Sequence, residues 1–83
     1  MANVGRKPRV TDDELLDEIF ELTKSHDNPV VTTQEVTDGL PLKKDSVYDR
    51  LNKLHDEEKV LKKKVGAKGV VWWLSLEEKV SRS

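Results

Sequence analysis

The sequence contains no cysteine, few aromatic residues and no long apolar run, and each absence narrows what the chain can be. Without cysteine there is neither a disulfide framework nor a thiolate zinc site, so an intracellular setting is the default expectation. No stretch approaches the roughly 18 apolar residues that a membrane span requires. Residues 1–10 also lack the hydrophobic segment of a signal peptide. We therefore expect a soluble, cytoplasmic protein with no membrane partner.

Charged residues make up 37% of the chain, and they are unevenly distributed although the net charge is only −1. Residues 1–10 contain three bases and no acid, whereas residues 11–42 contain nine acids and one lysine. Residues 43–74 contain nine bases and five acids. A chain of 83 residues forms one small domain. The charge separation therefore predicts a dipolar molecule whose basic pole combines the N-terminal arm with the second half of the chain.

A capping box marks the start of the first expected helix. Thr11 and Glu14 have the spacing at which the threonine hydroxyl accepts from the glutamate amide while the carboxylate accepts from the threonine N–H. Val10 and Leu15 stand at the positions of a hydrophobic staple. Apolar residues follow at helical spacing, so the pattern predicts an amphipathic helix from Thr11 to about Ser25.

The same capping signal recurs after a minor strand expected at residues 29–31. Thr32 would cap a second helix, with Glu35 at its third position. Because Gly39 and Pro41 follow within two turns, this helix must be short.

A third helix is expected from about Lys44 to Glu58. Its apolar residues Val47, Leu51 and Leu54 recur at intervals of four and three, which places them in one narrow stripe. One face of this helix should therefore be buried, and the rest should face solvent.

The periodicity changes after residue 59. The runs at 60–65 and 70–74 are rich in β-branched and aromatic residues, and the glycine-containing loop between them predicts an antiparallel hairpin. Alternation places Trp72 and Trp73 on opposite faces. We expect the face with Trp72 to close the core and Trp73 to remain partly exposed. The chain then divides into a flexible basic arm at residues 1–10, a folded domain at 11–76 and a polar tail at 77–83.

The segment VTTQEVTDGLPLKKDSVYDRLNKL resembles a helix-turn-helix, because a short capped helix, a tight turn and a longer helix follow one another. With the following KVLKKKVGAKGVVWWL it resembles the winged-helix family, and more narrowly the small stand-alone transcriptional regulators frequent in archaea. The resemblance spans residues 6–76. It implies an α+β winged helix-turn-helix, a three-helix bundle with a C-terminal β-hairpin wing. It also implies double-stranded DNA as the partner, with the third helix in the major groove and the wing on the backbone or minor groove.

Candidate DNA contacts fall into three groups. On the third helix, polar side chains suited to base edges or phosphates are Ser46, Tyr48 and Asn52, the asparagine matching adenine. Basic residues at the start or flanks of this helix, placed for phosphate contact, are Lys43, Lys44, Arg50 and Lys53. The wing would contact phosphates through Lys62, Lys63, Lys64 and Lys68. The arm would reach the backbone or minor groove through Arg6, Lys7 and Arg9.

Three aspartates on the third helix oppose this interpretation, because carboxylates repel phosphates. Asp45 lies in the first turn, where an acid suits the helix dipole. Asp49 and Asp56 have the spacing to form ion pairs with Lys53 and Lys59, respectively. These acids favour an alternative function, a winged-helix module that binds protein and not DNA.

Catalytic and metal-binding patterns are not evident in the sequence. His26 and His55 lie in different segments without cysteine partners, and no glycine-rich phosphate loop or activated nucleophile can be identified. We therefore expect no enzymatic activity, no cofactor or metal, and no small-molecule effector. Since many regulators of this type bind two-fold sites, we also expect a weak homodimer, formed through the first helix or an exposed tryptophan.

Overall fold

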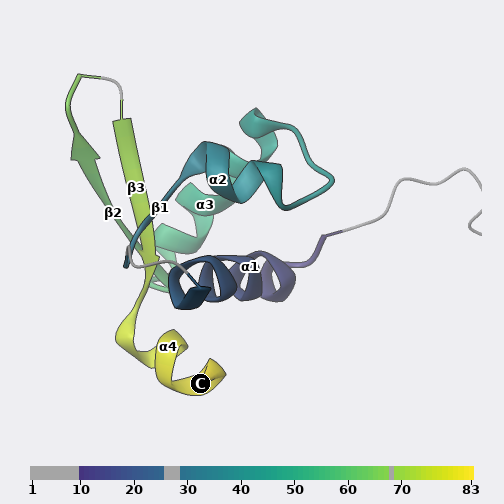
Figure 1. The fold of residues 1–83 in the computed structure, drawn as a ribbon, viewed down its shortest axis with the longest axis vertical. Helices are drawn as coiled ribbons and strands as arrows, with labels where there is room; N and C mark the ends of the chain where they lie inside the picture. Colours follow the sequence, from purple (N-terminus) through teal and green to yellow (C-terminus); the bar gives the residue numbers. More distant parts are fainter. Residues whose placement is uncertain (1–9, 26–28, 68) are drawn as a thin grey trace, which may run out of the picture.

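The protein has an α+β fold in which helices cover one face of a small antiparallel sheet (Figure 1). The computed structural model describes residues 10–25, 29–67 and 69–83. Within these ranges the helices are α1 (Asp12–Ser25), α2 (Thr33–Asp38), α3 (Lys44–Asp56) and α4 (Leu76–Arg82). The strands are β1 (Val31–Thr32), β2 (Val60–Val65) and β3 (Gly69–Leu74).

Both predicted capping boxes are present. At the start of α1, the Glu14 amide donates to Thr11 Oγ1 at 3.1 Å, and the Thr11 amide donates to Glu14 Oε1 at 3.0 Å. At the start of α2, the equivalent distances between Thr32 and Glu35 are 3.1 and 2.8 Å. Each box satisfies two amides that the first turn would otherwise leave free, which is why local sequence determines where these helices begin.

The end of α3 is a Schellman motif. The Glu58 amide donates to the His55 carbonyl at 3.0 Å, and the Lys59 amide donates to the Leu54 carbonyl at 2.9 Å. Glu58 has a φ of 62°, a left-handed conformation that glycine normally supplies at this position. The motif reverses the chain directly into β2. Helix α3 therefore ends at Asp56, two residues before the end that the sequence predicted.

The three strands form an antiparallel sheet in the order β1-β3-β2. Lys62 lies opposite Trp72 and Lys64 opposite Val70, so these four side chains share the face that the helices cover. Lys63 lies opposite Val71 and therefore occupies the outer face. The predicted hairpin is confirmed. Strand β3 begins at Gly69, one residue earlier than predicted, and Gly66 has the left-handed conformation at the turn.

The hydrophobic core lies between the inner face of the sheet and α1, α2 and α3. Trp72 is fully buried and is the largest side chain in the core, and its indole N–H donates to Thr33 Oγ1 at 2.8 Å. The expectation that the Trp72 face closes the core is confirmed, because Leu74 is also buried whereas Trp73 is half-buried. The remaining buried core members are Leu15, Leu16, Ile19, Val31, Val36, Val47, Leu51, Leu54 and Val60.

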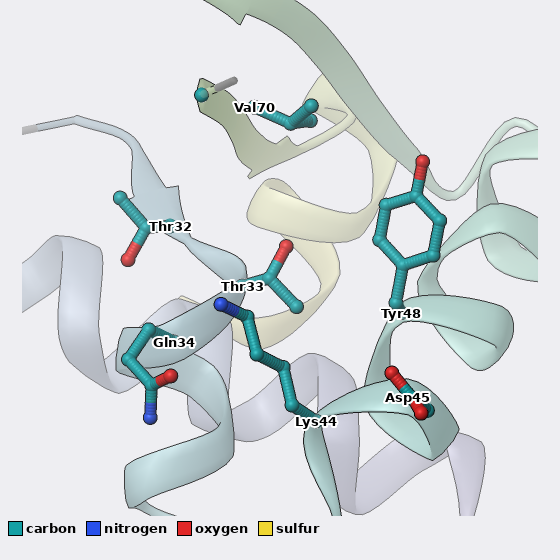
Figure 2. A pocket seen from close by; sticks show the side chains of 8 residues that line it. Thr32, Thr33, Gln34, Lys44, Asp45, Tyr48 and Val70 are labelled. Carbon is teal, nitrogen blue, oxygen red and sulfur yellow. The ribbon is translucent and has the colours of Figure 1, made fainter.

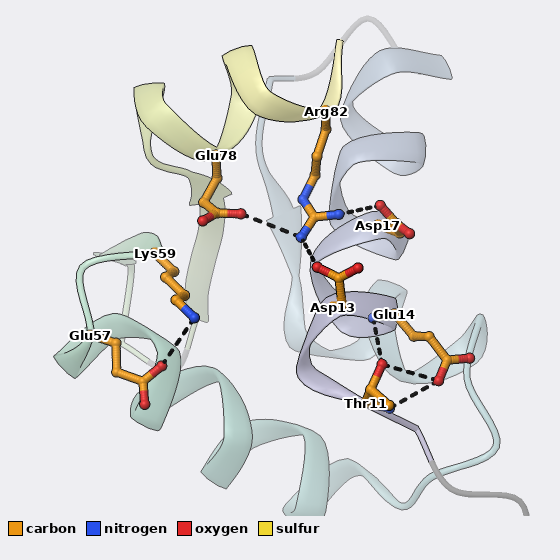
Figure 3. Close-up of polar contacts among 8 residues, drawn as sticks. All are labelled: Thr11, Asp13, Glu14, Asp17, Glu57, Lys59, Glu78 and Arg82. Atoms are coloured by element: carbon orange, nitrogen blue, oxygen red, sulfur yellow. Dashed lines mark hydrogen bonds and ion pairs between the residues drawn. The ribbon is translucent and has the colours of Figure 1, made fainter.

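The C-terminal segment is helical, which the sequence analysis did not predict when it assigned residues 77–83 to a polar tail. Helix α4 contributes no buried residue to the core. Arg82 attaches it to α1: its guanidinium donates to Asp13 at 2.7 Å and to Asp17, and it pairs with Glu78 at 3.3 Å (Figure 3). The chain thus contains a fourth helix in addition to the three that were expected.

Candidate nucleic-acid interface

A cleft of about 280 Å³ opens between the N-terminal ends of α2 and α3 and the end of the hairpin (Figure 2). Lys44 extends from α3 toward the side of the cleft formed by α2, and Tyr48 forms the opposite wall. The other lining residues are Thr32, Thr33, Gln34, Asp45, Gly69 and Val70. Three separate segments therefore build one concave surface, and two of the candidate DNA-contacting residues, Lys44 and Tyr48, line it.

Tyr48 is held in position by the core. Its ring packs edge-on against Trp72, with the ring centroids 6.0 Å apart and the planes at 78°. An arrangement of this kind stabilises both rings beyond the area they bury. Because Tyr48 remains 42% exposed, it presents a rigid aromatic surface beside the cleft.

The sheet register separates the hairpin lysines. Lys62 and Lys64 project from the face that carries Val70, which lines the cleft, whereas Lys63 projects from the opposite face. Lys62 and Lys64 thus extend the basic surface of α3 onto β2. The sequence analysis treated the three lysines as equivalent, and the register assigns them to two surfaces.

Lys62 and Asn52 contact each other. Lys62 Nζ donates to Asn52 Oδ1 at 2.8 Å and lies 5.6 Å from the centroid of the Trp72 ring. Asn52 Nδ2 donates to the Tyr48 carbonyl at 3.2 Å. Both ends of the Asn52 amide therefore have partners within the chain, which differs from the free adenine-reading side chain expected from the sequence.

Arg50 faces α1 and pairs with Asp12 at 2.8 Å, with its side chain 29% exposed. The hydrogen bond from Arg50 holds the pKa of Asp12 below its usual value; burial opposes the shift, and the positive charges of Arg50 and Lys53 add to it. Arg50 thus joins α3 to α1, on a different side of the helix from Tyr48. Lys53, three residues after Arg50 on the same helix, lies on this side too.

Lys43 and Ser46 are exposed at the start of α3. Lys43 is the N-cap residue, and its side chain makes no capping hydrogen bond. Ser46 lies seven residues before Lys53, which places the two on the same side of the helix. The polar candidates on α3 thus divide between a hairpin side, with Lys44, Tyr48 and Asn52, and a side near α1.

The aspartates of α3 are exposed, and Asp45 lines the cleft. The expected ion pairs of Asp49 with Lys53 and of Asp56 with Lys59 are not among the salt bridges of the described residues. Lys59 pairs instead with Glu57 at 3.7 Å (Figure 3). Asp49 and Asp56 thus lie at the outward face of α3 without a cationic partner among the described residues.

Four candidate contacts lie outside the described residues: Arg6, Lys7, Arg9 and Lys68. Conversely, the sequence analysis missed Gln34 and the two threonines before it, which the structure places in the cleft. The capping box at Thr32 was the available signal, because it fixes where α2 begins and hence which residues form its first turn.

Comparisons with protein-family models, with curated proteins and with solved structures found no significant match to this chain. Within residues 10–25, 29–67 and 69–83, no helix has the length and apolar character to cross a bilayer. The same residues include no group of three or more potential metal ligands. The side chains around the open cleft are a lysine, a carboxylate, an amide, hydroxyls and an aromatic ring, and they define the chemistry that the site offers.

Proposed function

We propose that the protein is a winged-helix regulator of transcription that binds double-stranded DNA in the cytoplasm and acts without catalysis or a cofactor. In this proposal α2 and α3 are the helix-turn-helix and the β2–β3 hairpin is the wing. One observation carries the proposal: Lys44 of α3 lines the cleft, and Lys64 of β2 projects from the strand face of Val70, which also lines it. Cations on two elements beside one concavity can neutralise neighbouring phosphates of a DNA strand.

The distribution of acids supports this orientation. Asp12 is paired with Arg50, and Asp13 and Asp17 are paired with Arg82, so three of the five acids in the first half of α1 have cationic partners within the chain. No residue of α1 lines the cleft. The surface that would approach DNA therefore keeps its cations, although the chain as a whole is slightly acidic.

In the proposed complex α3 enters the major groove, where Tyr48 and Ser46 contact base edges or phosphates. Lys44 and Lys64 neutralise phosphates on either side of the cleft. A homodimer on a two-fold site, expected from the family resemblance, remains a prediction.

The alternative function is binding to another protein. Two observations on different surfaces favour it. Asp49 and Asp56, on the outward face of α3, form no salt bridge with another described residue, and Leu61 and Val65 are 40% and 45% exposed on the outer face of the sheet. A partner bound through these apolar residues would use the outer face, which also carries Lys63. The two functions therefore involve opposite faces of β2.

Substitutions at two adjacent residues of β2, Lys63 and Lys64, test which face of the strand binds DNA. Lys64→Glu and Lys63→Glu make the same charge change on the same strand, one on the cleft face and one on the outer face. Affinity for a labelled random-sequence duplex is measured by fluorescence anisotropy at low salt. We expect Lys64→Glu to weaken binding about tenfold or more, and Lys63→Glu to weaken it much less, because only the first reverses a charge beside the bound strand. Equal effects of the two variants, or no binding by the unaltered chain, would contradict the proposal.

A further inference from the structure

We propose that Lys62 is a positioning residue that fixes the hairpin against α3 through Asn52, and that it does not serve as a phosphate contact. The inference is drawn from the free protein. Its consequence for affinity rests on the proposed DNA-binding function. It assigns different roles to two lysines, Lys62 and Lys64, that share a strand face and carry the same charge.

The geometry joins three elements through one ammonium group. Lys62 Nζ, from β2, donates to Asn52 Oδ1 of α3 at 2.8 Å and lies 5.6 Å from the ring centroid of Trp72 in β3. Asn52 is oriented in turn by its own bond to the Tyr48 carbonyl at 3.2 Å. A cation that bonds an amide oxygen and also faces an indole ring gains from both interactions.

The outer part of β2 has little apolar packing that could fix its direction. β2 forms one edge of the sheet, and after the buried Val60 its five remaining residues are all exposed. On β3, Val70 and Val71 are partly exposed. Apolar packing therefore fixes β3, through Trp72, Leu74 and the partly buried Val70, whereas the only buried side chain of β2 is Val60. Lys62 lies opposite Trp72, two residues beyond Val60, and its contact with Asn52 ties this exposed part of β2 to α3.

This contact determines the distance between the cations of the interface. Lys44 lies on α3 and Lys64 lies near the hairpin tip, so their separation depends on the angle between α3 and β2. If that angle is fixed before binding, less conformational freedom is lost when both lysines contact DNA. Because the side-chain oxygen of Asn52 accepts the hydrogen bond from Lys62, contacts of α3 with base edges would be made by residues such as Tyr48 and Ser46.

The inference is tested with Lys62→Met and Asn52→Ala, singly and together, and with Lys64→Met as the matched control. Methionine keeps the length of the side chain but removes its charge and its donor. In the free protein, hydrogen exchange is measured at the amides of the outer hairpin that face the partner strand, Lys63, Val65 and Val71. Lys62→Met and Asn52→Ala should each accelerate exchange there about fivefold, and Lys64→Met should leave it unchanged.

The same variants are then titrated with duplex DNA over a range of salt concentrations. Lys62→Met, Asn52→Ala and the double variant should all lose about the same factor, on the order of tenfold, since each breaks one shared contact. Their salt dependence should match that of the unaltered chain. Lys64→Met should instead reduce the slope of log K against log salt by about 0.9, the value for one phosphate contact.

The inference is overturned if the outer hairpin exchanges at the same rate in all variants. It is also overturned if Lys62→Met lowers the salt slope as Lys64→Met does while Asn52→Ala binds normally, because Lys62 would then contact a phosphate directly. Failure of the unaltered chain to bind DNA would contradict the proposed function, and the exchange measurement would still decide whether Lys62 positions the hairpin.

Discussion

Trp72 depends on one buried hydrogen bond as well as on its packing. The indole N–H has Thr33 Oγ1 as its partner at 2.8 Å, and Thr33 is itself only 7% exposed. The nearly isosteric change Thr33→Val keeps the volume and leaves a buried donor without a partner. We expect it to lower the free energy of unfolding by about 1–3 kcal/mol, measured by urea denaturation followed by tryptophan fluorescence.

Thr37→Val is the matched control for this prediction, because it deletes a hydroxyl whose acceptor is the carbonyl of Thr33 on the same helix. No buried donor is left free by that change, so its effect should be within about 0.5 kcal/mol. Equal destabilisation by the two variants would show that the hydrogen bond of Trp72 contributes no more to the free energy of unfolding than the hydroxyl of Thr37 does.

Glu58 has a left-handed backbone conformation at the end of α3. Its φ of 62° is unfavourable for a residue with a Cβ, yet the Schellman motif at the end of α3 requires it. Glu58→Gly should raise the free energy of unfolding by about 0.5–1 kcal/mol, after allowance for the greater freedom of glycine in the unfolded chain. A fall in the urea midpoint would contradict this account.

The neighbouring residue provides the control for Glu58. Glu57 has a φ of −87°, which any residue adopts, so Glu57→Gly gains nothing from the absence of a side chain. We expect this variant to be less stable than the unaltered chain, and the two glycine substitutions should thus act in opposite directions.

At the scale of elements, helix α4 is held mainly by charge. Arg82 is 11% exposed and contacts Asp13, Asp17 and Glu78, while Leu76 and Val80 face solvent at 75% and 65% exposure. Arg82→Ala should therefore release α4 from α1. Since the carboxylates of Asp13 and Asp17 are largely exposed, the loss of global stability should be modest, about 1 kcal/mol.

Hydrogen exchange at the amides of α4 provides the sharper measurement of this prediction. Exchange should accelerate strongly in Arg82→Ala, with little change in α1 and α3. Lys79→Ala, which removes an exposed cation from the same helix, should leave the protection of α4 intact. Protection of α4 that survives in Arg82→Ala would mean that other contacts hold the helix.

The elements that could be predicted from sequence are those whose signals are local. The capping boxes and apolar spacing located α1 and α2, the stripe through Leu51 located α3, and the glycine loop located the hairpin. Helix α4 was missed although Ser75 and Glu78 have the spacing of the other two capping signals, and the Glu78 amide donates to Ser75 Oγ at 3.3 Å. What local sequence could not indicate is its attachment to α1, because the partners of Arg82 lie 65 and 69 residues away. A contact of that range leaves no periodic trace in the segment itself.

The candidate site shows the same limit. The sequence analysis gave Lys62, Lys63 and Lys64 the same role, although strand alternation alone separates Lys63 from its two neighbours. The pairings of Arg50 with Asp12 and of Lys62 with Asn52 depend on how α3 is rotated against α1 and the hairpin. Side chains that look equivalent on a helical wheel therefore acquire different roles only when the elements pack.

At the scale of the whole molecule, the chain combines a net charge of −1 with a local concentration of cations. Asp12, Asp13 and Asp17 of α1 are paired with Arg50 and Arg82, whereas Lys44 lines the open cleft and Lys64 projects from the strand face beside it. Binding driven by this arrangement must come from local contacts with phosphates, because the molecule as a whole does not attract a polyanion.

The salt dependence of binding to duplex DNA tests that claim most directly. If about six phosphates are contacted, log K should fall linearly with log salt, and affinity should drop on the order of a thousandfold between about 50 and 200 mM. An affinity that does not change with salt, or no binding at the lowest concentration, would contradict the account.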